Sequence, residues 1–494
     1  MLLLQLDRKN PKPLYTQIIN QIKEKVSQDV LKPGTKLPST RQMAEKLGVN
    51  RSTVYKAYQE LWAQGYIESR PGSYSQIRKR QKIATPELKM EQSSLPWNQV
   101  TTLSSQHIYQ DYLKFNPEKS VSPTEDIINM AQLDIDPRLF PADDFRRCLS
   151  QIMLKQGSNV LGYGEYMGYK PLRETIAKRL QMHGILADSD EILITNGSQN
   201  GIELLLKLLT VTGKKVAIES PTYAIILPLL KYYQTEMAVV PMRKHGLDLN
   251  HLKNTLETQP ISFLFTMPNF QNPSGITSTQ SHREKLLSLC EAHNIPIVED
   301  GFEEEMKYFG RVPPPIKSMD RKNICIYLGT FSKVLFPGLR IGWITADKEC
   351  IQRLVALKRF SDLTSSFVLQ AAVNEFCERG YYDLHIKRMH RIFRKRMQTA
   401  ITAMQNYFPK ENVSWNEPAG GYLIWIQIKN VHKDETELIQ IFEENGVMVS
   451  PGQYYYPHPT SDKCFRLSIA MLDEKEISEG IIRLGQAIQK ASSF

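Results

Sequence analysis

Residues 324–340 have the sequence ICIYLGTFSKVLFPGLR, in which an apolar run passes directly into a polar one. The run Ile324–Leu328 is typical of a buried β-strand. The eleven residues from Thr330 to Arg340 then carry two hydroxyls, one amine and one guanidinium. Ligands of open α/β sheets bind where parallel strands end, so this junction predicts both a strand of such a sheet and part of a ligand site.

Further apolar runs, separated by helical patterns, predict other strands of the same sheet. These runs are Ile192–Thr195, Val216–Glu219, Ile261–Met267, Ile295–Glu299 and Ile341–Thr345. Alternating strands and helices favour an α/β domain with a largely parallel, buried sheet. Beyond it, a basic amphipathic helix starts near Lys387–Arg396, and the runs Tyr422–Ile428 and Cys464–Ile469 predict a smaller α+β subdomain.

The charge of the chain is concentrated at its beginning. The 494 residues carry a net charge of +10, yet residues 1–80 alone hold 15 Lys and Arg against 6 Asp and Glu. A basic module beside a nearly neutral body favours binding to a polyanion, most often nucleic acid. An ordinary solvated basic face is the alternative.

Composition argues against several other classes of protein. Apolar residues make up 41% and charged residues 23%, as in globular proteins. The six cysteines include no C-x-x-C pair and the ten histidines no H-E-x-x-H, so we expect neither a disulfide framework nor a metal site. Signal-peptide features and apolar runs of about 18 residues are absent, which predicts a cytoplasmic protein outside the membrane.

Two local patterns near the N-terminus predict helices. Apolar residues recur four apart from Leu14 to Val26, which predicts a helix over about residues 14–29. The segment Ser39–Gln42 matches an S-x-x-Q capping box, and Gly48 suits the end of a helix, so a second, short helix is expected between them.

A third helix is predicted after Asn50, which can cap it. The spacing i, i+3, i+4, i+7 defines its buried stripe, which consists of Val54, Ala57, Tyr58 and Leu61. The exposed face, which suits a DNA groove, carries Arg51, Ser52, Thr53, Tyr55 and Lys56. Residues 65–74 then alternate around a Pro-Gly turn, as in a short β-wing. Together these elements predict a winged helix-turn-helix.

This segment resembles the DNA-binding domain of the GntR family. The family patterns L-P-S-x-R, N-R-x-T-V and G-x-I are met at Leu37–Arg41, Asn50–Val54 and Gly65–Ile67. The resemblance implies a set of DNA-contacting residues, namely Ser39, Thr40, Arg41, Arg51, Ser52, Thr53, Tyr55, Lys56 and Arg70. At the wing tip, Arg70–Ser75 lacks the Gly-Thr that usually follows the serine, a difference that concerns minor-groove contacts rather than the fold.

The periodic patterns fade after Arg78 into a polar stretch that contains several X-Pro pairs. It exceeds the length of an ordinary loop inside a domain, so we interpret it as a linker between two folded bodies. The sequence thus predicts a DNA-binding domain over residues 1–78, a linker over 79–125 and a body over 126–494.

Polar groups follow three of the predicted strands of this body. Asn196–Gly201 precedes a helix, whose free N–H groups suit a phosphate, although a merely capped turn is the commoner case. A carboxylate at Asp300 needs a cationic partner, which a protonated ring nitrogen would be, with a helix cap as the alternative. Lys333 lies among apolar residues that should lower the pKa of its amine, as imine chemistry requires, unless it is an ordinary surface lysine.

In order and spacing, these motifs resemble the fold-type-I, pyridoxal-phosphate (PLP)-dependent aminotransferases, together with N-P-x-G at Asn272–Gly275 and G-x-R at Gly338–Arg340. The resemblance covers residues from about 126 to 494. It implies that Lys333 bonds covalently to PLP, while Asp300 pairs with the pyridinium nitrogen and Asn272 with the phenolic oxygen. Tyr223 would stack on the ring. The other cofactor residues, most of them at the phosphate, would be Gly197, Ser198, Gln199, Thr330, Ser332 and Arg340.

Three further positions bear on this resemblance. Tyr163, in Gly162-Tyr163-Gly164, matches the segment that reaches the phosphate of a neighbouring subunit, which implies a homodimer. Arg466 matches the arginine that grips a substrate carboxylate with its planar guanidinium. Phe302 replaces a tyrosine that usually lies two residues after the pyridinium-binding aspartate and bonds the phenolic oxygen. Its loss should raise the pKa of the imine and weaken transamination more than cofactor binding.

A GntR-like module followed by an aminotransferase-like body resembles the MocR subfamily of bacterial transcription regulators. The resemblance implies a PLP-dependent regulator that binds double-stranded operator DNA and senses a small amine, an amino acid or PLP itself. The alternative is a working aminotransferase with an accessory DNA-binding domain, and the extent of turnover stays open. A hydroxyl–lysine hydrolase fits less well, because the S-D-N and K-T-G motifs are absent.

Overall fold

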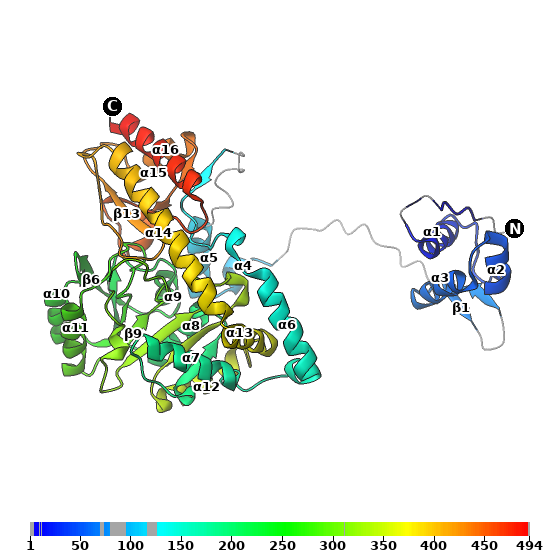
Figure 1. The fold of residues 1–494 in the computed structure, drawn as a ribbon, viewed down its shortest axis with the longest axis horizontal. Helices are drawn as coiled ribbons and strands as arrows, with labels where there is room; N and C mark the ends of the chain where they lie inside the picture. The colour runs from blue at the N-terminus through cyan, green and yellow to red at the C-terminus, as the bar shows by residue number, and fades with distance from the viewer. Residues whose placement is uncertain are drawn as a thin grey trace. The chain divides into compact units, whose positions relative to one another are not determined.

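The computed structural model describes residues 4–8, 10, 12–69, 74–79, 95–115, 126–310 and 312–492. The chain divides into two compact units, Met1–Pro96 and Trp97–Phe494 (Figure 1). Within the described ranges, no helix combines the length and the apolar character that a membrane span requires.

The first unit is a winged helix-turn-helix. Its elements are α1 (Leu14–Ser27), α2 (Thr40–Leu47), α3 (Arg51–Ala63), β1 (Ile67–Ser69) and β2 (Ser75–Ile77). The two strands pair antiparallel, with Ile67 opposite Ile77. The buried core includes Ile18, Ile22, Met43, Val54, Ala57, Leu61, Ile67 and Ile77. The sequence prediction of three helices and a wing is confirmed.

Local capping explains why these helices begin and end where they do. The Ser39 side chain accepts a hydrogen bond from the Gln42 N–H, and the Gln42 side chain accepts one from the Ser39 N–H, as in a capping box. Gly48 ends α2 with φ 61°, a left-handed conformation that favours glycine. Asn50 caps α3 by accepting from the Ser52 N–H at 3.0 Å. Each of these features was predicted from adjacent residues alone.

The second unit contains a large, mostly parallel sheet with the strand order β4-β11-β10-β9-β8-β5-β6-β7. The strands are β4 (Ile192–Thr195), β5 (Lys215–Ser220), β6 (Met237–Arg243), β7 (Gly246–Leu247), β8 (Ile261–Thr266), β9 (Ile297–Asp300), β10 (Cys325–Thr330) and β11 (Gly342–Thr345). The pairs from β6 to β10 are parallel, whereas β11 runs antiparallel to both neighbours. The largely parallel sheet is confirmed; β6 and β7 were not predicted.

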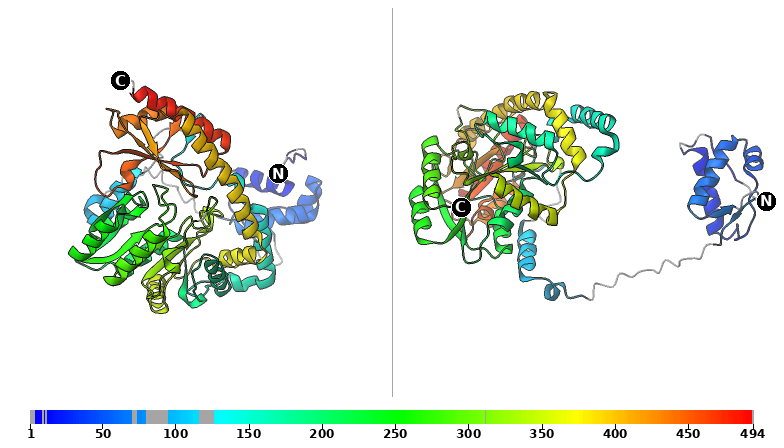
Figure 2. Two further views of the ribbon diagram at one scale, coloured as in Figure 1. Left: turned by 60° about the vertical axis from the view of Figure 1, so that its left-hand side comes forward. Right: turned by 90° about the horizontal axis from the view of Figure 1, so that it is seen from below.

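Helices cover both faces of this sheet (Figure 2), because alternate strand residues are apolar on both sides. One face packs on α8 (Ser198–Leu209), α9 (Ile226–Tyr232) and α12 (Lys348–Ser361). The other face packs on α7 (Lys170–Met182), α10 (Leu249–Thr258), α11 (Gln280–Ala292) and α13 (Phe367–Glu378). The helix α6 (Ala142–Gln156) also precedes the sheet in the chain. Both sheet faces are therefore buried, and ligands have access at the strand ends.

The C-terminal subdomain is an α+β layer, as predicted. Its antiparallel sheet has the order β12-β13-β16-β15, with β12 (Val413–Trp415), β13 (Leu423–Ile428), β15 (Ser450–Pro451) and β16 (Lys463–Ser468). It packs on α14 (Tyr381–Tyr407) and α16 (Glu474–Ser492), which lie side by side (Figure 2). The helix α15 (Glu435–Glu444) precedes β14 (Val447–Met448), which pairs with β3 (Ile128–Asn129). The helix α14 begins six residues before Lys387, near which the sequence predicts its start.

The described part of the predicted linker is not all extended chain. It contains α4 (Trp97–Val100) and α5 (Leu103–Phe115), which belong to the second compact unit. The carboxylate of Asp111 on α5 forms an ion pair with the ammonium of Lys231 on α9 at 3.1 Å. Asp111 is buried. The linker predicted over residues 79–125 is therefore interrupted by a helix that packs on the body. Such long-range packing leaves no local mark in a polar stretch.

Candidate functional site

The parallel register of β9 and β10 brings two predicted site segments to one edge of the sheet. Leu328 lies opposite Asp300, so the polar residues after β10 follow directly beside the end of β9. Asp300 is the last residue of its strand, and Thr330 the last of its own, rather than residues just beyond. The strand-end position predicted for both is confirmed, with a shift of one or two residues.

Lys333 lies in the turn after β10 and points toward the segment that precedes the first helix of the body. Its Nζ donates a hydrogen bond to the carbonyl of Leu133 at 2.7 Å and lies 3.9 Å from Oδ1 of Asp134. Burial lowers the pKa of this amine, with Asp134 opposing the shift. Its backbone carbonyl accepts from the Tyr422 hydroxyl at 2.6 Å. A lysine held this way keeps a larger neutral, nucleophilic fraction than an exposed one.

Asp300 presents an unsatisfied carboxylate oxygen. The residue is 4% exposed, and its Oδ1 has no hydrogen-bond partner among the described residues. Burial raises the pKa of this carboxyl to about 7. A buried carboxylate without a cation is costly, so a bound group that brings a positive N–H to Oδ1 would satisfy it. This orphaned oxygen fits the pyridinium nitrogen of PLP.

The turn between β4 and α8 forms a cradle of the kind that binds anions. Gly197 has φ +85°, and a Cβ at this position would approach Nη2 of Arg340 to 2.7 Å. Arg340 donates to the carbonyl of Asn196 at 3.2 Å, which holds the guanidinium beside the first turn of α8. The helix starts at Ser198, and its N-cap residue, Gly197, makes no side-chain hydrogen bond to the first turn within the described ranges. The donor set suits a phosphate group.

Two more hydroxyls border this cradle. Oγ1 of Thr330 donates to the carbonyl of Ile341 at 3.3 Å and accepts from the N–H of Ser332 at 3.1 Å. Oγ of Ser332 is buried and has no partner in the part of the chain that the structure describes. A buried hydroxyl without a partner is suited to donating a hydrogen bond to an anionic oxygen.

The aromatic and amide groups of the predicted site also converge. The Tyr223 hydroxyl lies 3.1 Å from Oε1 of Gln199, and burial raises the pKa of that phenol. Nη1 of Arg466 donates to Oδ1 of Asn272 at 3.2 Å, and Nη2 donates to the carbonyl of Ala131 at 2.6 Å. The guanidinium thus lies beside the amide that was expected at the cofactor oxygen.

Two predicted residues bring no polar side chain to this group within one chain. The side chain of Tyr163 is 88% exposed. Phe302 is 7% exposed and its side chain has no polar atom, although its backbone N–H donates a hydrogen bond to the Asp300 carboxyl. Their proposed roles, toward a second subunit and in tuning the imine, stay predictions.

Glu303 is a buried ionisable residue that the sequence analysis missed. It is 1% exposed; Oε2 accepts from the N–H of Tyr422 at 3.2 Å, and Oε1 has no partner within the described ranges. Burial raises the pKa of its carboxyl to about 8, while the nearby cations Lys333 and Arg466 oppose the shift. It stands first in the run Glu303–Glu305, and such an acidic run is typical of a solvated surface. No sequence signal marked it as internal.

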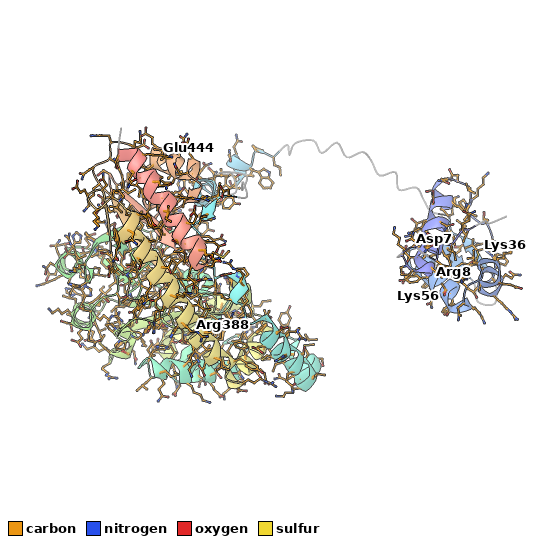
Figure 3. All side chains as sticks on the ribbon, turned by 45° about the horizontal axis from the view of Figure 1, so that its top comes forward. Asp7, Arg8, Lys36, Lys56, Arg388 and Glu444 are labelled. Carbon is orange, nitrogen blue, oxygen red and sulfur yellow. The ribbon has the colours of Figure 1, made fainter. Side chains whose placement is uncertain are left out.

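The predicted DNA face of the first unit is on the surface. Arg51, Ser52 and Tyr55 are exposed on α3. The ammonium of Lys56 lies 4.2 Å over the ring of Tyr15, a cation–π contact with α1 (Figure 3 labels Lys56). Arg70 lies outside the described residues. The structure thus leaves the N-terminal part of α3 free, while Lys56 also supports the packing of α3 on α1.

Comparison with known proteins accounts for both units. Residues 14–75 match the family of bacterial regulatory proteins named gntR, and residues 128–484 match the aminotransferase class I and II family. The chain is 30% identical over 486 residues to the uncharacterized HTH-type transcriptional regulator YdfD of Bacillus subtilis, and the match covers 97% of each of the two chains. It is 27% identical over 487 residues to the probable rhizopine catabolism regulatory protein MocR of Rhizobium meliloti. That match covers 98% of this chain and 96% of the relative. The chain is a MocR-type regulator of the GntR family.

The body of this MocR-type regulator also resembles solved enzymes. The α-aminoadipate aminotransferase LysN of Thermus thermophilus, complexed with N-(5'-phosphopyridoxyl)-L-leucine, matches with a TM-score of 0.73 and 28% identity. The match covers 81% of this chain and all of that enzyme. The predicted fold class, a winged helix-turn-helix joined to a fold-type-I aminotransferase-like body, is confirmed.

Proposed function

We propose that this MocR-type regulator binds PLP in its body and double-stranded operator DNA through α3, and that a small amine or amino acid in the body changes DNA affinity. The observation that carries the cofactor assignment is the orphaned Oδ1 of Asp300, at the end of the strand that pairs with β10, the strand that Lys333 follows. The solved relative that contains a phosphopyridoxyl group supports it.

The residues of the chain would divide the work as follows. PLP supplies an aldehyde carbon and a ring nitrogen that withdraws electrons when protonated. The Lys333 amine would be the group that holds the aldehyde carbon of the cofactor. Asp300 would hold the proton on the ring nitrogen, and Arg340 with the first turn of α8 would bind the phosphate. Arg466 would grip the carboxylate of an amino acid in bidentate fashion.

Borohydride reduction followed by peptide mapping tests the cofactor assignment directly. Reduction of protein purified with added PLP should fix the cofactor on Lys333, and Lys333→Ala should abolish the adduct without unfolding the body. Lys317→Ala, which removes another buried lysine, serves as the control. An adduct on a different lysine, or none at all, would refute the proposal.

A working aminotransferase is the second candidate, favoured by the placement of Arg466 beside Asn272. In a keto-acid coupled assay we expect slow turnover, because Phe302 cannot donate a hydrogen bond to the phenolic oxygen. Phe302→Tyr should raise the rate and lower the pH midpoint of the visible spectrum. Rapid turnover by the wild type would favour the enzyme.

A dimer is part of the proposal. Tyr163 is exposed in one chain, together with the neighbouring apolar side chains of Leu161 and Tyr166. Such a patch suits burial against a second copy. Sedimentation of the wild type and of Tyr163→Ala would show whether the segment is needed for association and for cofactor retention.

A further inference from the structure

The last turn of α12 buries a lysine. The side chain of Lys358 is 1% exposed, and a buried ammonium is costly unless it is paired. Its Nζ donates a hydrogen bond to Oδ1 of Asp362 at 2.7 Å. Most ion pairs four residues apart on a helix are exposed and contribute little to stability, and the pair of Glu349 and Arg353 on the same helix is of this kind. The pair of Lys358 and Asp362 differs, because loss of its carboxylate would leave a charge buried and unpaired.

The second carboxylate oxygen of Asp362 contacts a different part of the fold. Oδ2 accepts a hydrogen bond from the side-chain amide of Asn196. Asn196 lies between β4 and α8, 166 residues away in the chain. Nζ of Lys207 on α8 also donates to Oγ of Ser361 at 3.3 Å. The end of α12 is therefore attached to both the turn and the helix that form the anion cradle.

Three polar groups of Asn196 make hydrogen bonds. Its backbone N–H donates to Oδ1 of Asn200 at 3.1 Å, and its carbonyl accepts from Nη2 of Arg340 at 3.2 Å. Its side-chain amide donates to Asp362. A change in the orientation of Asn196 would therefore move both the carbonyl that holds Arg340 and the turn from which α8 starts.

We infer that Asp362 is a positioning residue for the phosphate cradle formed by the first turn of α8 and Arg340. Lys358 holds and neutralises its carboxylate, the carboxylate fixes the side chain of Asn196, and Asn196 in turn holds the guanidinium of Arg340. Because Asp362 is an anion, it acts through Asn196 and not on the phosphate. This inference rests on the proposed function for the identity of the bound anion as the phosphate of PLP.

A helix cap is the alternative role for Asp362. Its backbone N–H donates to the carbonyl of Lys358 at the C-terminal end of α12. A cap would stabilise the body without distinguishing a ligand that carries a phosphate from one that lacks it. The decisive measurement is therefore phosphate binding compared with binding of the same ring without a phosphate.

The test uses three ligands of the full-length apoprotein, namely inorganic phosphate, PLP and pyridoxal, which is PLP without its phosphate. The double variant Lys358→Met/Asp362→Leu removes the acceptor for Asn196 and leaves no buried ammonium unpaired, and such replacements of buried ion pairs are often neutral for folding. Equilibrium dialysis should show that it binds inorganic phosphate and PLP about tenfold more weakly than the wild type, as expected for the loss of one hydrogen bond to a charged group. Its affinity for pyridoxal should change less than about twofold.

Two further variants separate positioning from folding. Asn196→Ala removes the same hydrogen bond at its donor and should give the same selective loss of phosphate and PLP, whether or not the first variant folds. Lys358→Met/Asp362→Asn keeps an oxygen that can accept from Asn196, so its phosphate affinity should return to within about threefold of the wild type. The control Glu349→Gln changes the exposed ion pair on the same helix and should alter none of the three affinities.

Inorganic phosphate separates this inference from the proposed function, because its binding needs no PLP. If the wild type binds inorganic phosphate but not PLP, and Asn196→Ala loses phosphate, the proposed cofactor is refuted and the positioning role stands. If the wild type binds both and the variants bind them as tightly, or lose pyridoxal as much as PLP, the positioning role is refuted and the proposed function stands. Binding of neither ligand by the wild type would refute both.

Discussion

The two units hold their functional polar groups in opposite environments. On α3, Arg51 and Ser52 are exposed to solvent. The hydrophobic core beneath them contains none of the residues that we assign to DNA binding. In the body, Asp300 and Glu303 are buried, and each has an oxygen without a partner among the described residues. Exposed charges suit a phosphate backbone that stays hydrated, whereas buried groups suit a ligand that must be desolvated before it reacts. The difference predicts different sensitivities to mutation and pH.

The largest effect is expected at Asp300. If Asp300 pairs with a protonated ring nitrogen, Asp300→Ala should weaken PLP binding by about 3–5 kcal/mol, or roughly two to four orders of magnitude. Equilibrium dialysis of the apoprotein against PLP measures it. Asp134→Ala removes a carboxylate whose side chain is 46% exposed and should change the affinity far less. Comparable losses in both variants would contradict the pairing.

The next effect separates the two units by their cores. Leu61 is fully buried in the first unit, so Leu61→Ala should destabilise that unit by about 2–5 kcal/mol. DNA binding should weaken or disappear while the visible spectrum of the body keeps its shape. Trp62→Ala, at a neighbouring side chain that is 61% exposed, is the control. Loss of the spectrum together with DNA binding would show that the two units fold as one.

A smaller effect is expected on the DNA face. Arg51→Ala should weaken operator binding by about 1–3 kcal/mol at physiological salt, that is about 5- to 150-fold. Titration of labelled promoter DNA measures it. Arg353→Ala, an exposed arginine of α12 in the body, should leave the affinity unchanged. An unchanged affinity for Arg51→Ala would refute the placement of α3.

The smallest effect, counted per pH unit and per group, is expected in the pH dependence of the stability of the body without cofactor. Burial raises the pKa of Asp300 to about 7 and that of Glu303 to about 8. The folded state therefore keeps protons that the unfolded chain has released above about pH 4. Stability is present at low pH and is lost as the pH rises toward 8, by up to about 1.4 kcal/mol per pH unit for each group.

Chemical denaturation of the apoprotein between pH 5 and pH 8, taken here as the approximate window of these two groups, measures this slope. Asp300→Asn removes the ionisable carboxyl at this position. The free energy of unfolding should then fall less steeply with pH, by the contribution of one titrating group. Asp143→Asn, at an exposed site in the first turn of α6, should not have this effect. A free energy of unfolding that rises with pH in this window would mean that other groups determine the pH dependence.

The winged helix-turn-helix was predictable because its signals are local. The capping box at Ser39, the left-handed Gly48 and the stripe on α3 involve residues at most a few positions apart. The same holds for the strand ends that carry Asp300 and Thr330, since an apolar run followed by polar residues marks them. Resemblance to known families then supplied roles for these positions.

The sequence by itself therefore determined that a winged helix-turn-helix precedes an α/β body, and that Asp300 and Thr330 lie at strand ends. Only the tertiary structure decided what those residues contact. Lys333 bonds to a carbonyl 200 residues away, and Arg466 to one 335 residues away. It also decided that α5 packs on the body and that Glu303 is buried. Backbone carbonyls look alike in every sequence, and burial of a polar side chain depends on chain segments that meet only in the folded state.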